Sequence, residues 1–282
     1  MTPPRPTEQR NPRSKGLGKL SARKIVLLMN DEEEQSLEAV RLAASSIAQA
    51  AEAVAARFEG GGRTIFLGSG TSGRIALQEV SEIPPTFGVD PDRFLAFGAG
   101  GESMGSAGIT RSEDDVEAAP KMLSSLRVGA LDAVIGVAAS GTTPFVVAGI
   151  VWARTAGAWT CGIANNPDTA LLEKAELPIL LSTGPEVLTG STRLKAGTAQ
   201  KLALNRITTA AMVRSGRVVE NHMVDIVVTI DKLRERAVRI VADLAHTSLE
   251  CARDLLEESD WSVREALRKA DPLAPTASRS DA

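Results

Sequence analysis

The chain has 282 residues, of which 43% are hydrophobic and 24% charged, and its formal net charge at pH 7 is −3. These values are typical of an ordinary globular protein, and the length allows one large domain or a main domain with a small companion. The weak negative charge and the 3% aromatic content provide no nucleic-acid surface, and the two histidines, His222 and His246, are too far apart in sequence to form a Cys/His metal cluster.

We expect no export signal at the beginning of the chain. Residues 1–16 are basic and rich in proline, but they lack the apolar run of a signal peptide. No uncharged apolar stretch elsewhere reaches the ~18–20 residues that a membrane span needs. We therefore expect a cytoplasmic protein that does not enter a membrane.

A long amphipathic helix is predicted over residues 31–58. Apolar residues recur there at spacings of three and four among strong helix formers. The glycines at 60–62 follow directly and are expected to end the helix. The residues that precede it are predicted to form an N-terminal arm.

Strands and helices alternate from residue 63 onward. A buried strand at 63–68 is followed by a helix at 74–82, which Pro84 and Pro85 are expected to end. Short apolar runs that alternate with helices indicate a parallel sheet covered on both faces, with ligands bound at the carboxyl ends of its strands. The other four strands are predicted at 93–97, 132–139, 160–164 and 177–181.

Beyond residue 190 the pattern becomes helical. A single helix is predicted over 191–215, opening on the hydroxyl pair Ser191-Thr192 as its cap and ending at Gly216. Amphipathic helices are expected within 231–245 and 247–270, before a frayed tail. The predicted organisation is an N-terminal arm and helix start (1–44), an α/β domain (45–220) and a C-terminal helical region with a disordered tail (221–282).

Three loops at predicted strand ends are rich in small and hydroxyl residues: GSGTSGR (68–74), AASGTTPF (138–145) and TGPEVLTGSTRLKAGTAQK (183–201). Backbone N–H groups at a helix start suit a phosphate, although the first loop does not meet the spacing of a dinucleotide fingerprint. Any one loop is explained as a helix cap, but three together favour a phosphorylated small molecule. The candidate substrate-binding residues are Ser69, Gly70, Thr71, Ser72, Ser140, Thr142, Thr143, Glu186, Ser191, Thr192 and Lys195.

The same loops carry a resemblance to a known family, the N-acetylmuramic acid 6-phosphate etherases. The similarity runs in order from TEQRNPRS near the start of the chain to about residue 240. The segments that carry it are GSGTSGRIALQEVSEIPPTFG (68–88), AGGE (99–102), SEDD (112–115), ASGTTPFV (139–146), GPEVLTGSTRLKAGTAQKLALN (184–205) and MVD (223–225).

The resemblance implies a sugar isomerase fold, similar to flavodoxin, and a cytoplasmic homodimer that needs no metal or organic cofactor. The helices at 31–58 and 191–215 are plausible elements of the dimer interface. The implied reaction cleaves the D-lactyl ether of N-acetylmuramic acid 6-phosphate to N-acetylglucosamine 6-phosphate and D-lactate, in amino-sugar catabolism or peptidoglycan recycling. It proceeds by elimination across C2 and C3 of the ring-opened sugar, followed by addition of water.

Two glutamates are the implied acid/base pair, Glu82 in SEIPPTFG and Glu113 in SEDD. A base must remove the C2 proton and an acid must protonate the leaving ether oxygen, and each such group is typically worth ~10²–10⁴ in rate. We expect the end of the helix at Pro84-Pro85 to aim the Glu82 carboxylate toward the strand ends. The residues alone do not choose Glu113 over its acidic neighbours, whereas the resemblance does.

The chain departs from the family pattern at several positions. The segment that usually reads SGRTPY reads SGTTPF here, so Thr142 replaces an arginine and the ionic contact of that arginine is expected to be absent. Gly18 stands where an aspartate is common, and Glu220 and His222 change a GNLMVD segment. The helical region after residue 240 is shorter than usual. We expect His222 to be a neutral surface or interface residue rather than a catalyst.

Two other functions remain compatible with the residues. An aldose–ketose isomerase acting on a sugar phosphate would need the same fold and also a base beside a carbonyl. A non-catalytic sugar-phosphate sensor would need the loops but neither glutamate. Release of D-lactate distinguishes the etherase from both.

Overall fold

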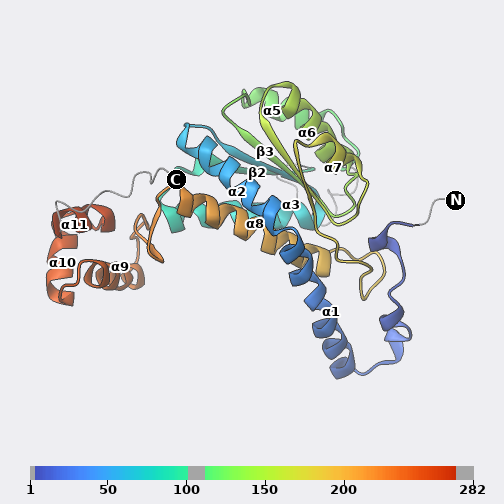
Figure 1. Ribbon diagram of the computed structural model, residues 1–282, viewed down its shortest axis with the longest axis horizontal. Helices are drawn as coiled ribbons and strands as arrows, with labels where there is room; N and C mark the ends of the chain where they lie inside the picture. The colour runs from blue at the N-terminus through green and yellow to red at the C-terminus, as the bar shows by residue number, and fades with distance from the viewer. Residues whose placement is uncertain (1–3, 101–111, 271–282) are drawn as a thin grey trace.

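The computed structural model describes residues 4–100 and 112–270. Residues 101–102 of the AGGE segment and the predicted tail at 271–282 lie outside the described residues. Figure 1 shows a layered α/β body, with an N-terminal arm and helix on one side and a small helical module on the other.

A five-stranded parallel sheet forms the centre of the body, in the order β2-β1-β3-β4-β5. Because both faces are covered by helices, the strands are continuous apolar runs. All five strands predicted from the sequence are confirmed to within one residue at each end. They are β1 (Thr64–Gly68), β2 (Phe94–Gly98), β3 (Ala133–Ala138), β4 (Trp159–Ala164) and β5 (Leu177–Leu180).

Two hydrophobic cores lie on opposite faces of this sheet. Successive residues of β1 point to opposite faces, so Phe66 enters one core while Ile65 and Leu67 enter the other. The first core packs against α2 (Ala44–Glu59), α3 (Gly70–Phe87) and α8 (Lys195–Arg214). The second packs against α5 (Ala118–Ser125), α6 (Pro144–Thr155) and α7 (Ala170–Lys174), as Figure 1 shows.

The single helix predicted over 31–58 is wrong, because the chain forms two helices there. Helix α1 (Ala22–Leu42) begins nine residues earlier than predicted, and a turn at Ala43 separates it from α2. No glycine or proline marks this break, so the sequence pattern could not reveal it. The first half of α1 projects away from the body, and it leaves Val26 and Leu27 about half exposed.

The end predicted for the following helix is also wrong, since α3 continues through Pro84 and Pro85 to Phe87. The prolines remove two backbone donors, but the Thr86 hydroxyl donates to the carbonyl of Glu82 at 2.6 Å and helps to hold this turn. The helix ends instead at Gly88, whose φ of +59° only glycine adopts readily.

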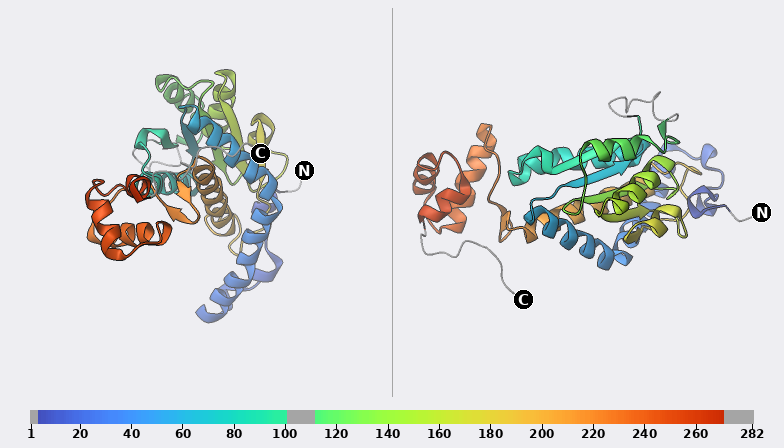
Figure 2. Two further views of the ribbon diagram at one scale, coloured as in Figure 1. Left: turned by 60° about the vertical axis from the view of Figure 1, so that its left-hand side comes forward. Right: turned by 90° about the horizontal axis from the view of Figure 1, so that it is seen from above.

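The C-terminal helical region forms a small module with its own core, as Figure 2 shows. Its core includes Val241, Leu256 and Ala266. Arg264 donates to both carboxylate oxygens of Asp225 within the module, at 2.6 and 2.7 Å, and to the carbonyl of Gly216, just after α8, at 2.6 Å. The elements are the hairpin β6 (Val218–Val219) and β7 (His222–Met223), and the helices α9 (Asp231–Leu244), α10 (Leu249–Glu257) and α11 (Val263–Ala270). Among the described residues, no helix combines the length and apolar composition of a transmembrane span.

An ion pair fastens the beginnings of the two central strands to each other. Asp132, just before β3, accepts hydrogen bonds from the backbone and the guanidinium of Arg63, just before β1, at 2.8 to 3.0 Å. Burial raises the pKa of Asp132, but the hydrogen bonds from Arg63 and from the Gly129 backbone outweigh burial, so the net pKa lies below its ordinary value of 3.8.

We expect Asp132→Asn to lower the free energy of unfolding at pH 7 by about 1.5–3 kcal/mol, the range for hydrogen bonds to charged groups. Because the folded-state pKa of Asp132 is depressed, its stabilisation is present above about pH 4 and is lost as the pH falls through that pKa. Denaturant unfolding of both proteins between pH 7 and pH 3 checks this. A difference that stays constant over the whole range would contradict it.

Candidate active site

The order of the strands creates a crevice at the carboxyl edge of the sheet. The chain leaves β1 through α3 on one face and leaves the neighbouring β3 through α6 on the other face. Gly68, the last residue of β1, pairs in register with Val137 of β3. The loops that follow these two strands therefore lie side by side, at the switch point where open parallel sheets bind ligands.

The first loop turns sharply from β1 into α3. A Cβ atom on Gly68 would lie 2.6 Å from the Gly73 nitrogen, so the turn requires glycine. The first N–H groups of α3, from Gly70 onward, have no carbonyl partner within the helix and face the loop. Thr71 and Gly70 are half-buried, whereas the buried hydroxyl of Ser72 donates to Gln200 of α8 at 2.8 Å and so points into the packing between helices.

Glu113 lies at this loop. The Ser69 hydroxyl donates to its carboxylate at 2.6 Å, and its carbonyl accepts a hydrogen bond from the Phe145 backbone at the start of α6. The carboxylate is thus fixed between the first turns of α3 and α6. Its acidic neighbours differ, because Asp114 is exposed and Asp115 accepts from backbone N–H groups that lead into α5.

The second loop presents three half-buried hydroxyl residues before α6. Gly141 has a φ of +69°, and a Cβ there would lie 2.2 Å from the Thr169 hydroxyl. Ser140 accepts from the backbone of Thr142 at 3.2 Å, and its hydroxyl lies 3.5 Å from that of Thr143. The loop is therefore held open by glycine and lined by hydroxyls at a helix start, which suits an anion.

The third segment is close to the first, because a Cβ on Gly197 would lie 3.4 Å from the Thr71 methyl group. Ser191 and Thr192 are half-buried in the turn that precedes α8. The prediction that they cap this helix is wrong. The cap is Glu186, whose carboxylate accepts from the backbone N–H groups of Lys195 and Ala196 at 3.1 and 3.0 Å.

The two charged residues predicted in this segment are fully buried and form hydrogen bonds within the protein. Lys195 is 1% exposed, and its ammonium donates to Glu32 and to Gln35, both at 2.7 Å. Glu186 is 0% exposed, and burial raises its pKa although the two N–H groups that it accepts from lower it. These contacts suit residues that hold α8 and α1 in place.

The N-terminal arm also reaches the strand ends. Apart from the TEQRNPRS similarity, nothing in the sequence pattern indicated this contact. Thr7 is buried, and its backbone N–H donates to Asn166, just beyond β4, at 3.1 Å. Arg5 donates to the Thr142 hydroxyl at 2.8 Å. A guanidinium from another part of the chain thus reaches the loop in which Thr142 stands.

Glu82 is the one predicted catalytic residue that the chain does not bring to these loops. It is exposed and lies twelve residues after Gly70 in α3. At 1.5 Å per residue, this separation is about 18 Å along the helix, too far for its side chain to reach the loops of the same chain. The expectation that its carboxylate points toward the strand ends of its own chain is wrong.

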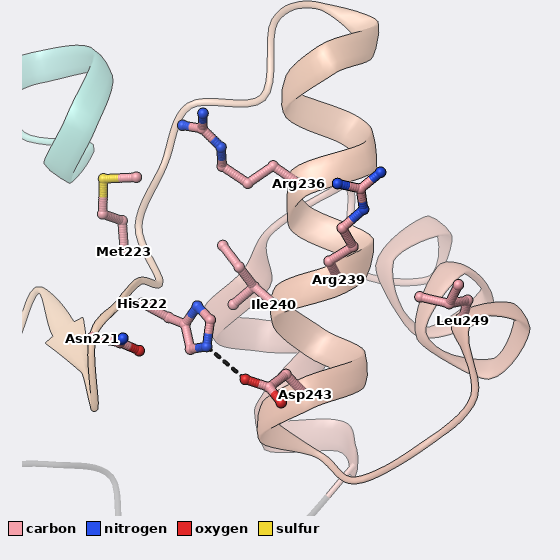
Figure 3. Close-up of a pocket in the computed structure, with 8 residues that line it drawn as sticks. All are labelled: Asn221, His222, Met223, Arg236, Arg239, Ile240, Asp243 and Leu249. Atoms are coloured by element: carbon pink, nitrogen blue, oxygen red, sulfur yellow. Dashed lines mark hydrogen bonds and ion pairs between the residues drawn. The ribbon is translucent and has the colours of Figure 1, made fainter.

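A separate pocket of about 580 Å³ belongs to the C-terminal module, as Figure 3 shows. There the His222 ring nitrogen lies 2.7 Å from the Asp243 carboxylate, with Arg236 and Arg239 on the same helix. The module meets the body near the end of α3, where the Val227 backbone contacts Pro85. His222 is thus far from the first turn of α3 and from the hydroxyl loops.

Comparisons with known proteins agree with this architecture. The chain is 42% identical over 253 residues to the N-acetylmuramic acid 6-phosphate etherase of Actinobacillus pleuropneumoniae serotype 5b, with 90% of this chain and 82% of that protein covered. It is 41% identical over 261 residues to the protein of the same name from Yersinia pestis strain Pestoides F, with 93% and 88% covered.

A family model described as the glucokinase regulatory protein N-terminal SIS domain matches residues 46–154. Among solved structures, a phosphoheptose isomerase from Francisella tularensis has a TM-score of 0.52 at 18% identity, with 68% of this chain and 98% of that chain covered. At that identity the likeness concerns the fold alone, and it confirms the predicted fold class.

Proposed function

The chain belongs to the family of N-acetylmuramic acid 6-phosphate etherases, which are carbon–oxygen lyases, and from this premise we propose that it cleaves the D-lactyl ether of N-acetylmuramic acid 6-phosphate. The products are N-acetylglucosamine 6-phosphate and D-lactate. The identity of 41–42% over at least 90% of the chain carries the proposal. The carboxylate of Glu113, set among hydroxyl loops at the switch point, supports it.

The phosphate of the substrate fits the hydroxyl loops. The starts of α3 and α6 each offer backbone N–H groups and a favourable helix dipole to an anion. Thr71, Ser140, Thr142 and Thr143 add hydroxyl donors around the same crevice, whereas the Ser69 hydroxyl donates to Glu113. Ser191 and Thr192 border it from the turn before α8, which the buried Glu186 and Lys195 hold in place.

The reaction needs a base for the C2 proton and an acid for the ether oxygen, and water then adds at C3. We assign these steps to Glu113 and Glu82. The elimination becomes possible once the sugar ring is open, because the C1 aldehyde then makes the C2 proton acidic. Since Glu82 is about 18 Å along α3 from the loops of its own chain, we propose that it enters the site of a second copy.

A homodimer would also cover surfaces that one chain leaves open. A cavity of about 780 Å³ lies between the first two helices and α8, lined by small and apolar residues such as Ile47, Ala48 and Ala210 and by charged residues such as Glu52 and Arg206. Val213, which lines it, is 44% exposed. Exposed apolar patches of this kind are typical of protein interfaces. The helices that line it are those that the sequence suggests for the interface.

We further propose that the protein works in the cytoplasm, in catabolism or recycling of cell-wall amino sugars, without a nucleic-acid partner. Its substrate class supports this placement, because phosphorylated sugars are intermediates of intracellular metabolism. Among the described residues, no three His, Cys, Asp or Glu side chains form a group that could hold a metal ion.

The decisive experiment is incubation of the purified protein with N-acetylmuramic acid 6-phosphate and enzymatic measurement of D-lactate. We expect stoichiometric release of D-lactate and N-acetylglucosamine 6-phosphate. An isomerase would convert a sugar phosphate without releasing lactate. A sensor would bind N-acetylglucosamine 6-phosphate tightly and leave the ether intact, and either result would overturn the proposal.

A further inference from the structure

The N-terminal arm places a guanidinium on the second hydroxyl loop. Nη1 of Arg5 donates to the Thr142 hydroxyl at 2.8 Å, across 137 residues of sequence. Arg5 itself is exposed, so the rest of its guanidinium faces solvent at the carboxyl edge of the sheet. A guanidinium carries five N–H donors, and a single bond to Thr142 leaves donors for an anion.

Buried contacts two residues away fix the position of Arg5. Thr7 is 1% exposed, and both its backbone N–H and its hydroxyl lie within 3.2 Å of the Asn166 side-chain oxygen. Asn166 is 0% exposed and donates to the carbonyl of Ala139, the residue before Ser140. The arm is thus anchored to the loop that Arg5 touches.

The local fold of the arm supports the same placement. The Arg5 carbonyl accepts from the Glu8 backbone at 2.8 Å, which closes a 3₁₀ turn over Pro6–Glu8. The Gln9 side chain donates to the carbonyl of Pro4 at 2.9 Å. Arg5 is therefore held between two local bonds and one buried anchor, which lowers the entropy lost when it binds a ligand.

The guanidinium of Arg5 is the positive charge that contacts the second hydroxyl loop. The second loop, residues 138–145, contains no charged residue of its own. Lys195, the cation predicted for the neighbouring segment, is engaged by Glu32 in the interior. Arg5 supplies a positive charge at the start of α6, where the hydroxyls and the helix dipole already favour an anion.

We propose that Arg5 binds the phosphate group of the sugar substrate, as the arginine of a phosphate site completed by the N-terminal arm. The proposal rests on the proposed function in so far as a phosphorylated sugar occupies the hydroxyl loops. Arg5 supplies, from a distant part of the chain, the positive charge that this loop lacks. It is a binding residue and takes no part in proton transfer.

The test compares Arg5→Ala with the wild type by calorimetric titration of N-acetylglucosamine 6-phosphate. Because a charge-assisted pair is lost, we expect the dissociation constant to rise about tenfold to a hundredfold. In the lactate assay KM should rise similarly while kcat changes less than about twofold. Arg5→Lys should recover part of the affinity, because it keeps the charge but not the fork of donors.

A second variant makes the comparison specific. Arg5→Ala combined with Thr142→Arg returns a guanidinium to the loop from the loop itself, and we expect it to restore most of the affinity. Lys15→Ala, which removes an exposed charge from the same arm, serves as the matched control and should bind like the wild type. All these positions are exposed or half-buried, so the variants should fold.

Unchanged binding of N-acetylglucosamine 6-phosphate by Arg5→Ala would overturn the proposal. If KM for the lactyl ether rose in the same variant, Arg5 would contact the lactyl carboxylate instead of the phosphate. A wild-type protein that binds this phosphosugar but releases no D-lactate would contradict the proposed reaction alone and leave the Arg5 comparison valid.

Discussion

Replacing Glu113 with Gln is expected to reduce kcat for D-lactate release from N-acetylmuramic acid 6-phosphate by about 10²–10⁴-fold. The amide keeps the size of the side chain and an oxygen that accepts from Ser69, so the loop should stay in place. It cannot take up or deliver the proton that elimination requires. Binding of N-acetylglucosamine 6-phosphate, measured by calorimetry, should therefore change little while turnover is lost.

The neighbouring carboxylate provides the control. Asp114 is exposed, and Asp114→Asn should retain turnover within about twofold if the effect depends on the contact of Glu113 with the loop. Near-normal turnover by Glu113→Gln, or an equal loss in both variants, would remove Glu113 from the reaction.

Glu82→Gln is expected to reduce kcat for D-lactate release by the same order as Glu113→Gln. Mixing the two inactive variants then tests whether two chains share a site. If Glu82 of one copy serves Glu113 of the other, random mixing forms half heterodimers, each with one intact site. Activity should then return to about a quarter of the wild-type value per site. Absence of any recovery after subunit exchange would contradict the shared site.

Lys195→Met is expected to lower the free energy of unfolding by about 3 kcal/mol, at the lower end of the range for breaking a buried ion pair. The side chains of Lys195 and Glu32 are 2% and 1% exposed, so the variant leaves a carboxylate in the interior. Asn11 and Arg13 still donate to that carboxylate, at 2.6 and 2.9 Å, which limits the loss. Urea denaturation measures the change.

Burial raises the pKa of Glu32, but the hydrogen bonds from Lys195 and Asn11 lower it by more than burial raises it. The net pKa therefore lies below its ordinary value. A double variant, Glu32→Gln with Lys195→Met, should recover part of the stability because no unpaired charge remains. Arg41→Met is the matched control, since its pair with Glu38 is largely exposed and should contribute at most about 0.5 kcal/mol. A Lys195→Met variant as stable as Arg41→Met but unable to bind the phosphosugar would make Lys195 a ligand instead.

The sheet could be predicted from the sequence because a buried parallel strand is a local signal. Residues 133–138 and 159–164 are short apolar runs bounded by polar turns, and such runs have few other ways to bury their surface. The helix breaks were harder. No glycine or proline marks the turn at Ala43. Helix α3 continues through Pro84 and ends only at Gly88.

The candidate site, like the fold, could be predicted from the sequence only in part. Hydroxyl residues after β1 and β3 could be identified from composition and from the position of each loop at the end of a strand. The roles of Glu186 and Lys195 could not, because a charged residue in a loop reads the same in sequence whether it faces a ligand or a buried partner. Burial and the contact with Glu32 distinguish these cases.

The sequence by itself determined the order of the strands along the chain, the three hydroxyl loops and the family to which the chain belongs. These properties reside in local patterns and in similarity along the chain. Only the tertiary structure decided that Arg5 meets Thr142, that Glu113 meets Ser69, and that Glu82 lies at the other end of its helix. Each depends on how segments that are distant in sequence pack together, and a short stretch of sequence does not specify which residues will be its neighbours in space.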